Sequence, residues 1–263
     1  MTTLLDTLPG PVATAKRAVP DSGPPSTVVR LFGGPYVDVD GQRREVPEGS
    51  KRLLVFVVLR RGRVDRRYAA GALWPTGTEQ RAAGNLRSAL WRLRCAGIDV
   101  LEADKLSLAL RADVGVDLLD VTTWAMSLIK GSVAPAELPL DRAWLEALDL
   151  LPGWYDDWAI FERERSRQRV LHALEALAGL LVRAGRCAEA VDVAMSAVGV
   201  EPLRESAQRA LVAAHLAEGN RVEASRCAAT YAALLHRELG EDLPADLAVI
   251  GSQRCPASAT GRA

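Results

Sequence analysis

The chain has 263 residues, of which 49% are apolar and 25% charged, and it contains only 4 Cys. This length allows one to three domains with a real hydrophobic core, and the apolar content excludes an intrinsically disordered chain. No apolar run approaches the roughly 20 residues that a membrane-spanning helix needs, so no membrane partner is expected. The cysteines are scattered and form no CxxC pair, which predicts a reducing, cytoplasmic location.

The net charge of zero hides two halves of opposite sign. Residues 27–112 carry 16 Lys and Arg against 9 Asp and Glu, a balance of +7. Residues 113–263 carry 15 against 22, a balance of −7, and residues 1–26 carry 2 of each kind. A basic half joined to an acidic half indicates a nucleic-acid partner for the basic half.

The basic half begins with patterns typical of short strands and then of helices. Strands are expected within residues 28–46, with a hairpin turn at Asp40-Gly41. The apolar run Leu53–Leu59 is either a buried strand or one side of a buried helix, which periodicity alone does not decide. Asp65 is placed to cap a helix that stops at Pro75.

The next helix of the basic half carries the candidate DNA-reading side chains. Leu86, Leu90 and Leu93 recur at spacings of four and three, which predicts an amphipathic helix over residues 79–97. Arginine forms paired hydrogen bonds with guanine, asparagine does so with adenine, and arginine also attracts phosphate. A solvated arginine-rich surface helix is the alternative, but the preceding helices, the following hairpin and the local charge favour DNA. The polar and basic residues expected on the open side and flanks are Asn85, Arg87, Ser88, Trp91, Arg92 and Arg94.

Three further cations and one aromatic ring complete the candidate DNA-binding set. Lys105 follows a turn at residues 103–104 and precedes a strand at 106–110, where it contacts a minor groove or a phosphate, or is simply solvated. Lys51 and Arg52 precede a possible helix whose N-terminal amides would add to phosphate attraction. Trp91 either packs on a base or sugar edge or leans half-buried on the hairpin.

From Asp117 onward the patterns predict helices alone. They are expected at about 117–130, 141–149, 159–184, 187–200, 203–218 and 221–239, with a proline-containing linker at 132–139. Residues 185–190 recur at 219–224 with Gly, Glu and Ala in place, an offset of 34 residues. A 34-residue period of paired helices is that of tetratricopeptide repeats.

Neither a catalytic site nor a metal or cofactor site is expected, so the chain is predicted not to be an enzyme. No Gly-Lys dipeptide is present, which excludes a Walker A loop. His172, His215 and His236 lack metal-ligand spacing. Asp156-Asp157 is interpreted as a helix cap ahead of Trp158.

Several motifs resemble the Streptomyces antibiotic regulatory protein family of transcriptional activators. In the basic half they are residues 50–54 (SKRLL), 72–75 (ALWP) and the helix at 86–94. In the acidic half, residues 151–158 (LPGWYDDW) and 201–205 (EPLRE) look like motifs of the bacterial transcriptional activator domain. The resemblance runs from about Val28 to Ile250.

The resemblance implies a mainly α fold with small β content. A winged helix-turn-helix domain like that of OmpR-type response regulators is expected over 28–112. An all-α tetratricopeptide-like domain, the bacterial transcriptional activator domain, is expected over 113–250. A flexible N-terminal tail at 1–27 and a C-terminal tail at 251–263 flank them. The 53–59 run then becomes a buried helix, 79–97 the recognition helix and 100–110 the wing.

The resemblance also implies partners. Such proteins are similar in binding direct repeats in double-stranded promoter DNA, often as side-by-side pairs, and in contacting RNA polymerase. The target would be a secondary-metabolite (antibiotic) gene cluster. The wing departs from the family pattern, since it reads Asp104 to Leu108 where a Gly-Tyr step is common. A helical-repeat adaptor or ligand-binding regulator without sequence-specific DNA binding is the alternative function. By analogy the polymerase-facing loop, otherwise an ordinary connector, comprises Pro75, Thr76, Gly77, Thr78 and Glu79.

Overall fold

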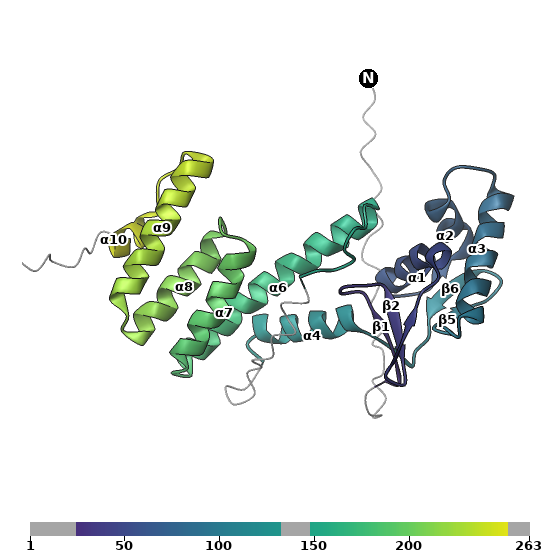
Figure 1. Cartoon of the computed structure of the whole chain (residues 1–263), viewed down its shortest axis with the longest axis horizontal. Coiled ribbons are helices and arrows are strands. Elements are labelled where there is room, and N and C mark those ends of the chain that lie inside the picture. The colour runs from purple at the N-terminus through teal and green to yellow at the C-terminus, as the bar shows by residue number, and fades with distance from the viewer. Residues whose placement is uncertain (1–24, 133–147, 252–263) are drawn as a thin grey trace, which may run out of the picture.

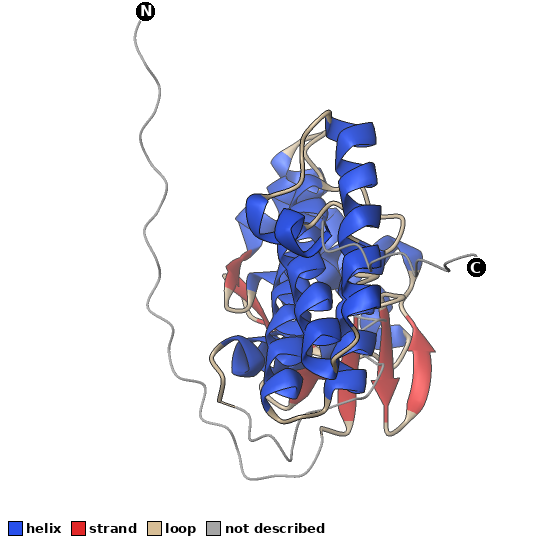
Figure 2. Cartoon of the chain, turned by 90° about the vertical axis from the view of Figure 1, so that its left-hand side faces the viewer, coloured by secondary structure: helices blue, strands red, loops and turns tan. Residues whose placement is uncertain are grey.

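A computed structural model describes residues 25–132 and 148–251 of the chain. The molecule is elongated, with the strands and the first three helices at one end and a row of helices toward the other (Figure 1). In the end-on view of Figure 2 the strands lie behind the row of helices. The predicted tails, the linker at 132–139 and the helix at 141–149 lie wholly or mostly outside the described residues.

The basic half contains two small sheets. The first has the strand order β3-β2-β1-β7 and the second has the order β4-β6-β5. Asp40 and Gly41 have φ angles of 50° and 76°, which confirms the tight hairpin turn that Asp-Gly predicts. The strand β7 was not predicted, because its three residues are too short for a pattern; it pairs in parallel with β1. The strands are β1 (Thr27–Arg30), β2 (Tyr36–Val39), β3 (Gln42–Glu45), β4 (Val64–Asp65), β5 (Leu101–Ala103), β6 (Ser107–Leu110) and β7 (Val114–Val116).

Three helices lie among these strands: α1 (Glu48–Arg60), α2 (Arg66–Leu73) and α3 (Glu79–Cys95). The ambiguous apolar run belongs to α1, which confirms the helix that the family resemblance implies. Its residues from 53 to 58 are all buried, so neighbours surround the helix and no one-sided periodicity was available to identify it.

Capping residues fix the starts of α2 and α3. The side chain of Asp65 accepts a hydrogen bond of 2.9 Å from the backbone nitrogen of Tyr68, as its predicted cap role requires. The hydroxyl of Thr78 accepts one of 3.3 Å from the nitrogen of Arg81 and caps α3. The two helices and the β5–β6 hairpin form the predicted winged helix-turn-helix.

From Asp117 onward the described elements are helices, as predicted, whereas the strand β7 lies just before them at the start of the acidic half. Its helices are α4 (Asp117–Ile129), α6 (Asp157–Arg183), α7 (Cys187–Val200), α8 (Glu205–Glu218), α9 (Arg221–Leu239) and α10 (Ala245–Gly251). Helices α6 to α9 pack each against the next, and α10, which was not predicted, packs on α9. Gly185 and Gly219, 34 residues apart, both have left-handed φ angles of 75° and 85° at equivalent interhelical turns. The tetratricopeptide likeness itself stays a prediction.

The hydrophobic core of the basic half extends into the second half of the chain. Leu150, Leu151 and Ala159 are buried in the same cluster as α1 and the first sheet. The nitrogen of Leu151 also donates to the carbonyl oxygen of Leu31 at 3.0 Å. The two halves therefore share one packed junction. Within the described residues, no helix combines the length and apolar character of a bilayer span.

Candidate nucleic-acid interface

The solvent face of α3 carries most of the predicted DNA-reading side chains. Leu86, Leu90 and Leu93 point into the core, as predicted, and this orientation leaves the opposite side of the helix open. The ring of Trp91 is 66% exposed, so it does not lean half-buried on the hairpin. The exposed candidate residues are Arg87, Ser88, Trp91 and Arg94.

A basic groove separates α3 from α2 and the wing. Its volume is about 440 Å³, and Arg66, Arg67, Arg87 and Lys105 line it. Glu79 is the acidic group in the lining and lies 3.5 Å from Arg67. Sequence reasoning missed Arg66 and Arg67; their place at the start of α2 in a helix-turn-helix could have indicated them. The groove concentrates positive charge where a nucleic-acid backbone could follow it.

The wing turn is held rigidly by one carboxylate. Asp104 accepts hydrogen bonds from the backbone nitrogens of Leu106 at 2.8 Å and Ser107 at 2.7 Å, and it pairs with Arg63. These backbone hydrogen bonds are the main reason that the pKa of Asp104 is lowered. Arg66 donates to the carbonyl oxygen of Asp104 at 2.9 Å. This network presents Lys105 and the 76% exposed side chain of Leu106 at the tip. Sequence reasoning had placed Leu106 inside a strand.

Two of the predicted DNA-binding residues on α3 are not on its open face. Arg92 donates from Nη2 to the carbonyl oxygen of Gly49 at 2.8 Å and is half-buried, so it ties α3 to the start of α1. Asn85 is half-buried too. The hydroxyl of Ser50 adds a buried bond of 2.9 Å to the carbonyl oxygen of Ala89. Arg92 therefore lies at the flank of α3 with its Nη2 atom bound to the protein, and its contact with DNA stays a prediction.

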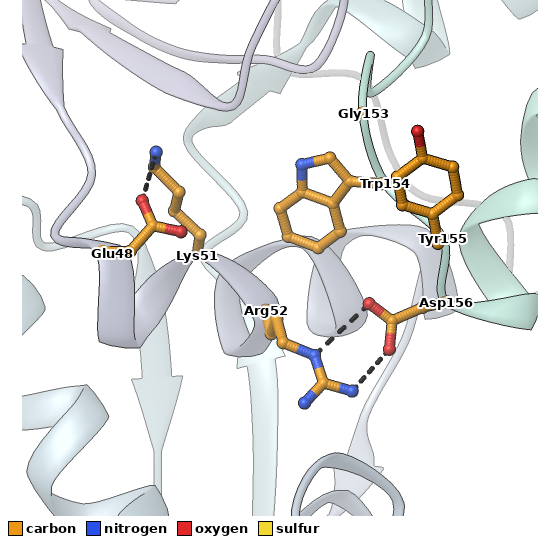
Figure 3. A pocket seen from close by; sticks show the side chains of 7 residues that line it. All are labelled: Glu48, Lys51, Arg52, Gly153, Trp154, Tyr155 and Asp156. Atoms are coloured by element: carbon orange, nitrogen blue, oxygen red, sulfur yellow. Dashed lines mark hydrogen bonds and ion pairs between the residues drawn. The ribbon is translucent and has the colours of Figure 1, made fainter.

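Lys51 and Arg52 also lie elsewhere than predicted. Helix α1 begins at Glu48, so both residues lie within it and not before it. Lys51 pairs with Glu48 at 2.7 Å, and Arg52 donates to the carbonyl oxygen of Leu73 at 2.9 Å and pairs with Asp156. Figure 3 shows these residues around a shallow pocket of about 460 Å³ that also contains Trp154 and Tyr155. Arg52 thus connects the two halves of the chain.

The junction between the halves is built from aromatic rings beside this ion pair. Trp158 of α6 meets Phe56 of α1 edge to face, with ring centres 5.5 Å apart, and Trp154 packs on Trp158 at 6.0 Å. Asp156 stands at the predicted capping position of α6, but its side chain makes no capping hydrogen bond and binds Arg52. The predicted capping role of this carboxylate is wrong, since the arginine competes for it.

The loop between α2 and α3 is exposed along its whole length, from Pro75 to Glu79. Thr78 caps α3, and Glu79 lies beside Arg67, so these two side chains have local partners. The remaining three residues of the loop are Pro75, Thr76 and Gly77. The loop is accessible to a partner protein, and its polymerase-facing role stays a prediction.

Comparison with known proteins identifies the second half. A family model described as the bacterial transcriptional activator domain matches residues 143–251. This part of the chain is therefore similar to the bacterial transcriptional activator domain. No curated protein matches the chain by sequence.

The fold of the whole chain, activator domain included, is similar to a solved structure of Mycobacterium tuberculosis EmbR in complex with a low affinity phosphopeptide. The TM-score is 0.63 at 18% identity, over 86% of this chain. The match spans 64% of the EmbR chain, so the two proteins differ in extent. The predicted fold, a winged helix followed by an all-α activator domain, is confirmed.

The described residues of the winged helix and the activator domain contain no group of three or more His, Cys, Asp or Glu placed to hold a metal ion. His215 of the activator domain lies 3.6 Å from Glu218, one turn away on α8.

Proposed function

We propose that the protein is a sequence-specific DNA-binding transcriptional activator. The observation that carries this proposal is the exposed basic face of α3, continuous with a groove lined by four cations and joined to an activator domain. Helix α3 would enter a major groove, and the wing would contact the neighbouring minor groove or backbone. The winged helix would span residues 28–112 and be completed by the strand β7, which pairs with β1, and the activator domain would follow to residue 250.

The exposed side chains divide by chemistry. Arg87 and Arg94 can donate hydrogen bonds to guanine edges or to phosphates, and so can Ser88. The ring of Trp91 can pack on a sugar or a base edge. Lys105 extends this surface onto the wing. We assign Asn85 a flanking role. We assign Lys51, Arg52 and Arg92 a supporting role beside this surface, because their charged groups bind protein atoms.

The partners follow from the family resemblance. The protein would bind direct repeats in promoter DNA as a side-by-side homodimer and contact the RNA polymerase holoenzyme through the exposed loop at residues 75–79. It would activate the genes of a secondary-metabolite (antibiotic) cluster and would act in the cytoplasm. The full accessibility of the loop supports the polymerase contact.

Fluorescence anisotropy on the upstream region of the neighbouring genes tests DNA recognition. Arg87→Ala should weaken specific binding by roughly tenfold or more, since a good bidentate base contact contributes about 1–3 kcal/mol. Arg237→Ala is the matched control, because Arg237 is an exposed arginine on α9 that pairs only with its neighbour Glu238 among the described contacts. Equal losses in both variants, or unchanged sequence preference in Arg87→Ala, would contradict the assignment of α3 as the recognition helix.

A further inference from the structure

Four arginines alternate along the first half of α6, and two of them are fully engaged. Arg163 donates to the carbonyl oxygens of Leu150 at 2.7 Å and Trp154 at 3.0 Å, which holds the loop before the helix. Arg167 donates to the carbonyl oxygen of Val200 at 3.2 Å and pairs with Glu201. The other two, Arg165 and Arg169, point to a different part of the surface.

Arg165 shares one carboxylate with Arg61, which follows the end of α1, and both arginines act electrostatically on Arg169. Nη1 of Arg165 lies 3.6 Å and Nη2 of Arg61 lies 3.5 Å from the carboxylate of Glu162. Glu162 itself is only 8% exposed, so it is fixed between the two helices. Two guanidinium groups therefore pair with a single carboxylate and a third, that of Arg169, lies within the electrostatic influence of all three groups, so the cluster has an excess of two positive charges.

Arg169 shows that this cluster is incomplete. Its Nη1 atom is buried and has no hydrogen-bond partner among the described residues. Burial, followed by the positive charges of Arg165 and Arg61, lowers the pKa of Arg169. A buried cationic donor without an acceptor is unfavourable, and an anion seated against it would supply the acceptor and the charge.

The backbone of Arg61 is an independent sign that its side chain is used. Its φ angle is 54°, in the left-handed region that glycine prefers at the end of a helix. Glycine stands at the very next position, Gly62. A long side chain in this strained conformation points to a role for that side chain.

We propose that Arg61, Arg165 and Arg169 bind a phosphate group at the junction of α1 and α6. Guanidinium forks match the oxygens of phosphate, and a dianionic phosphate would balance the two excess charges. The phosphate belongs either to a small phosphorylated ligand or inorganic phosphate, or to the backbone of a DNA duplex. The site does not include the face of α3, so it does not depend on the proposed reading of bases.

Thermal unfolding of the full chain tests this site with inorganic phosphate as the probe. At matched ionic strength, sodium phosphate should raise the Tm by about 3 °C relative to sodium chloride when the site approaches saturation. The double variant Arg165→Gln/Arg169→Gln should lose this rise, and its Tm in chloride should equal or exceed that of the wild type because repulsion is relieved. Arg226→Gln/Arg237→Gln on α9 removes the same charge far from the site and should keep the rise.

DNA binding in phosphate-free buffer identifies the source of the phosphate. A fivefold or greater loss of promoter affinity in the Arg165→Gln/Arg169→Gln variant, with competition by inorganic phosphate, assigns the site to the DNA backbone. Unchanged DNA affinity together with the lost Tm response assigns it to a free or small-molecule phosphate. The proposal fails if the double variant keeps the phosphate response, or if neither the Tm response nor the DNA affinity distinguishes it from the wild type.

Discussion

Alanine substitutions of two tryptophans in different environments should affect stability and DNA binding separately. Trp158 is half-buried and meets the rings of Phe56 and Trp154 edge to face, whereas Trp91 is 66% exposed on α3. A fully buried Trp→Ala change costs about 3–5 kcal/mol, so a half-buried ring accounts for about 2 kcal/mol. Two ring contacts add about 0.5–1.5 kcal/mol each, which brings the expected cost of Trp158→Ala to about 3–5 kcal/mol. Trp91→Ala should change stability by less than about 0.5 kcal/mol.

Urea unfolding followed by circular dichroism measures the first effect and fluorescence anisotropy the second. Trp158→Ala should lower the free energy of unfolding at 25 °C and leave the DNA affinity of the folded protein within about twofold of wild type. Trp91→Ala should keep the unfolding midpoint and weaken DNA binding by about fivefold or more. If Trp91→Ala destabilises as much as Trp158→Ala, or leaves the affinity unchanged, the assignment of an exposed DNA-facing ring is refuted.

Three further predictions concern single polar side chains. Burial raises the pKa of Asp117 from 3.8 to about 6 although backbone nitrogens donate to it, so its contribution to stability is present below pH 4 and lost as the pH rises through 6. The free energy of unfolding of the wild type relative to Asp117→Asn should fall by about 3 kcal/mol across this window in urea titrations, and a pH-independent difference would contradict it. Asp104→Ala removes the acceptor that orders the wing turn, so DNA affinity should drop severalfold in anisotropy with an unchanged far-UV spectrum; unchanged affinity would show that the wing makes no contact. Arg92→Ala should lower the Tm and leave the slope of log DNA affinity against log salt concentration unchanged. Arg87→Ala should reduce this slope by about one. A reduced slope in Arg92→Ala would show that Arg92 contacts DNA.

The fold was predictable where local chemistry decides the structure. The Asp40-Gly41 turn, the Asp65 cap and the leucine stripe of α3 all act within a few residues, and all three are found as predicted. Helix α1 was not resolved by its own pattern, because a helix buried on all sides has no polar face to reveal its period. The strand β7 depends on a partner strand far away in the sequence, which no local pattern encodes.

The sequence predicts which helix carries the candidate site, but not which of the candidate side chains are open to DNA. Helical spacing places side chains around α3, but it does not report what approaches the flanks. The start of α1 supplies the carbonyl oxygen that binds Arg92, and α6 supplies the carboxylate that binds Arg52. Both partners are distant in sequence, so an arginine expected to be open to DNA becomes a structural residue once the chain folds.

The split of charge between the halves has a local exception where the halves meet. The acidic half has a balance of −7, yet Arg165 of α6 and Arg61 of the basic half pair with one carboxylate, and Arg169 carries a third positive charge beside them. Summed charge describes the average field of a domain, whereas binding of a phosphate depends on the few groups within a hydrogen bond of it. The slope of DNA affinity against salt concentration therefore reports whether these arginines contact DNA phosphates. If the junction holds a DNA phosphate, the slope for the wild type exceeds that for the Arg165→Gln/Arg169→Gln variant by about one or two, and if it holds a free phosphate the two slopes coincide.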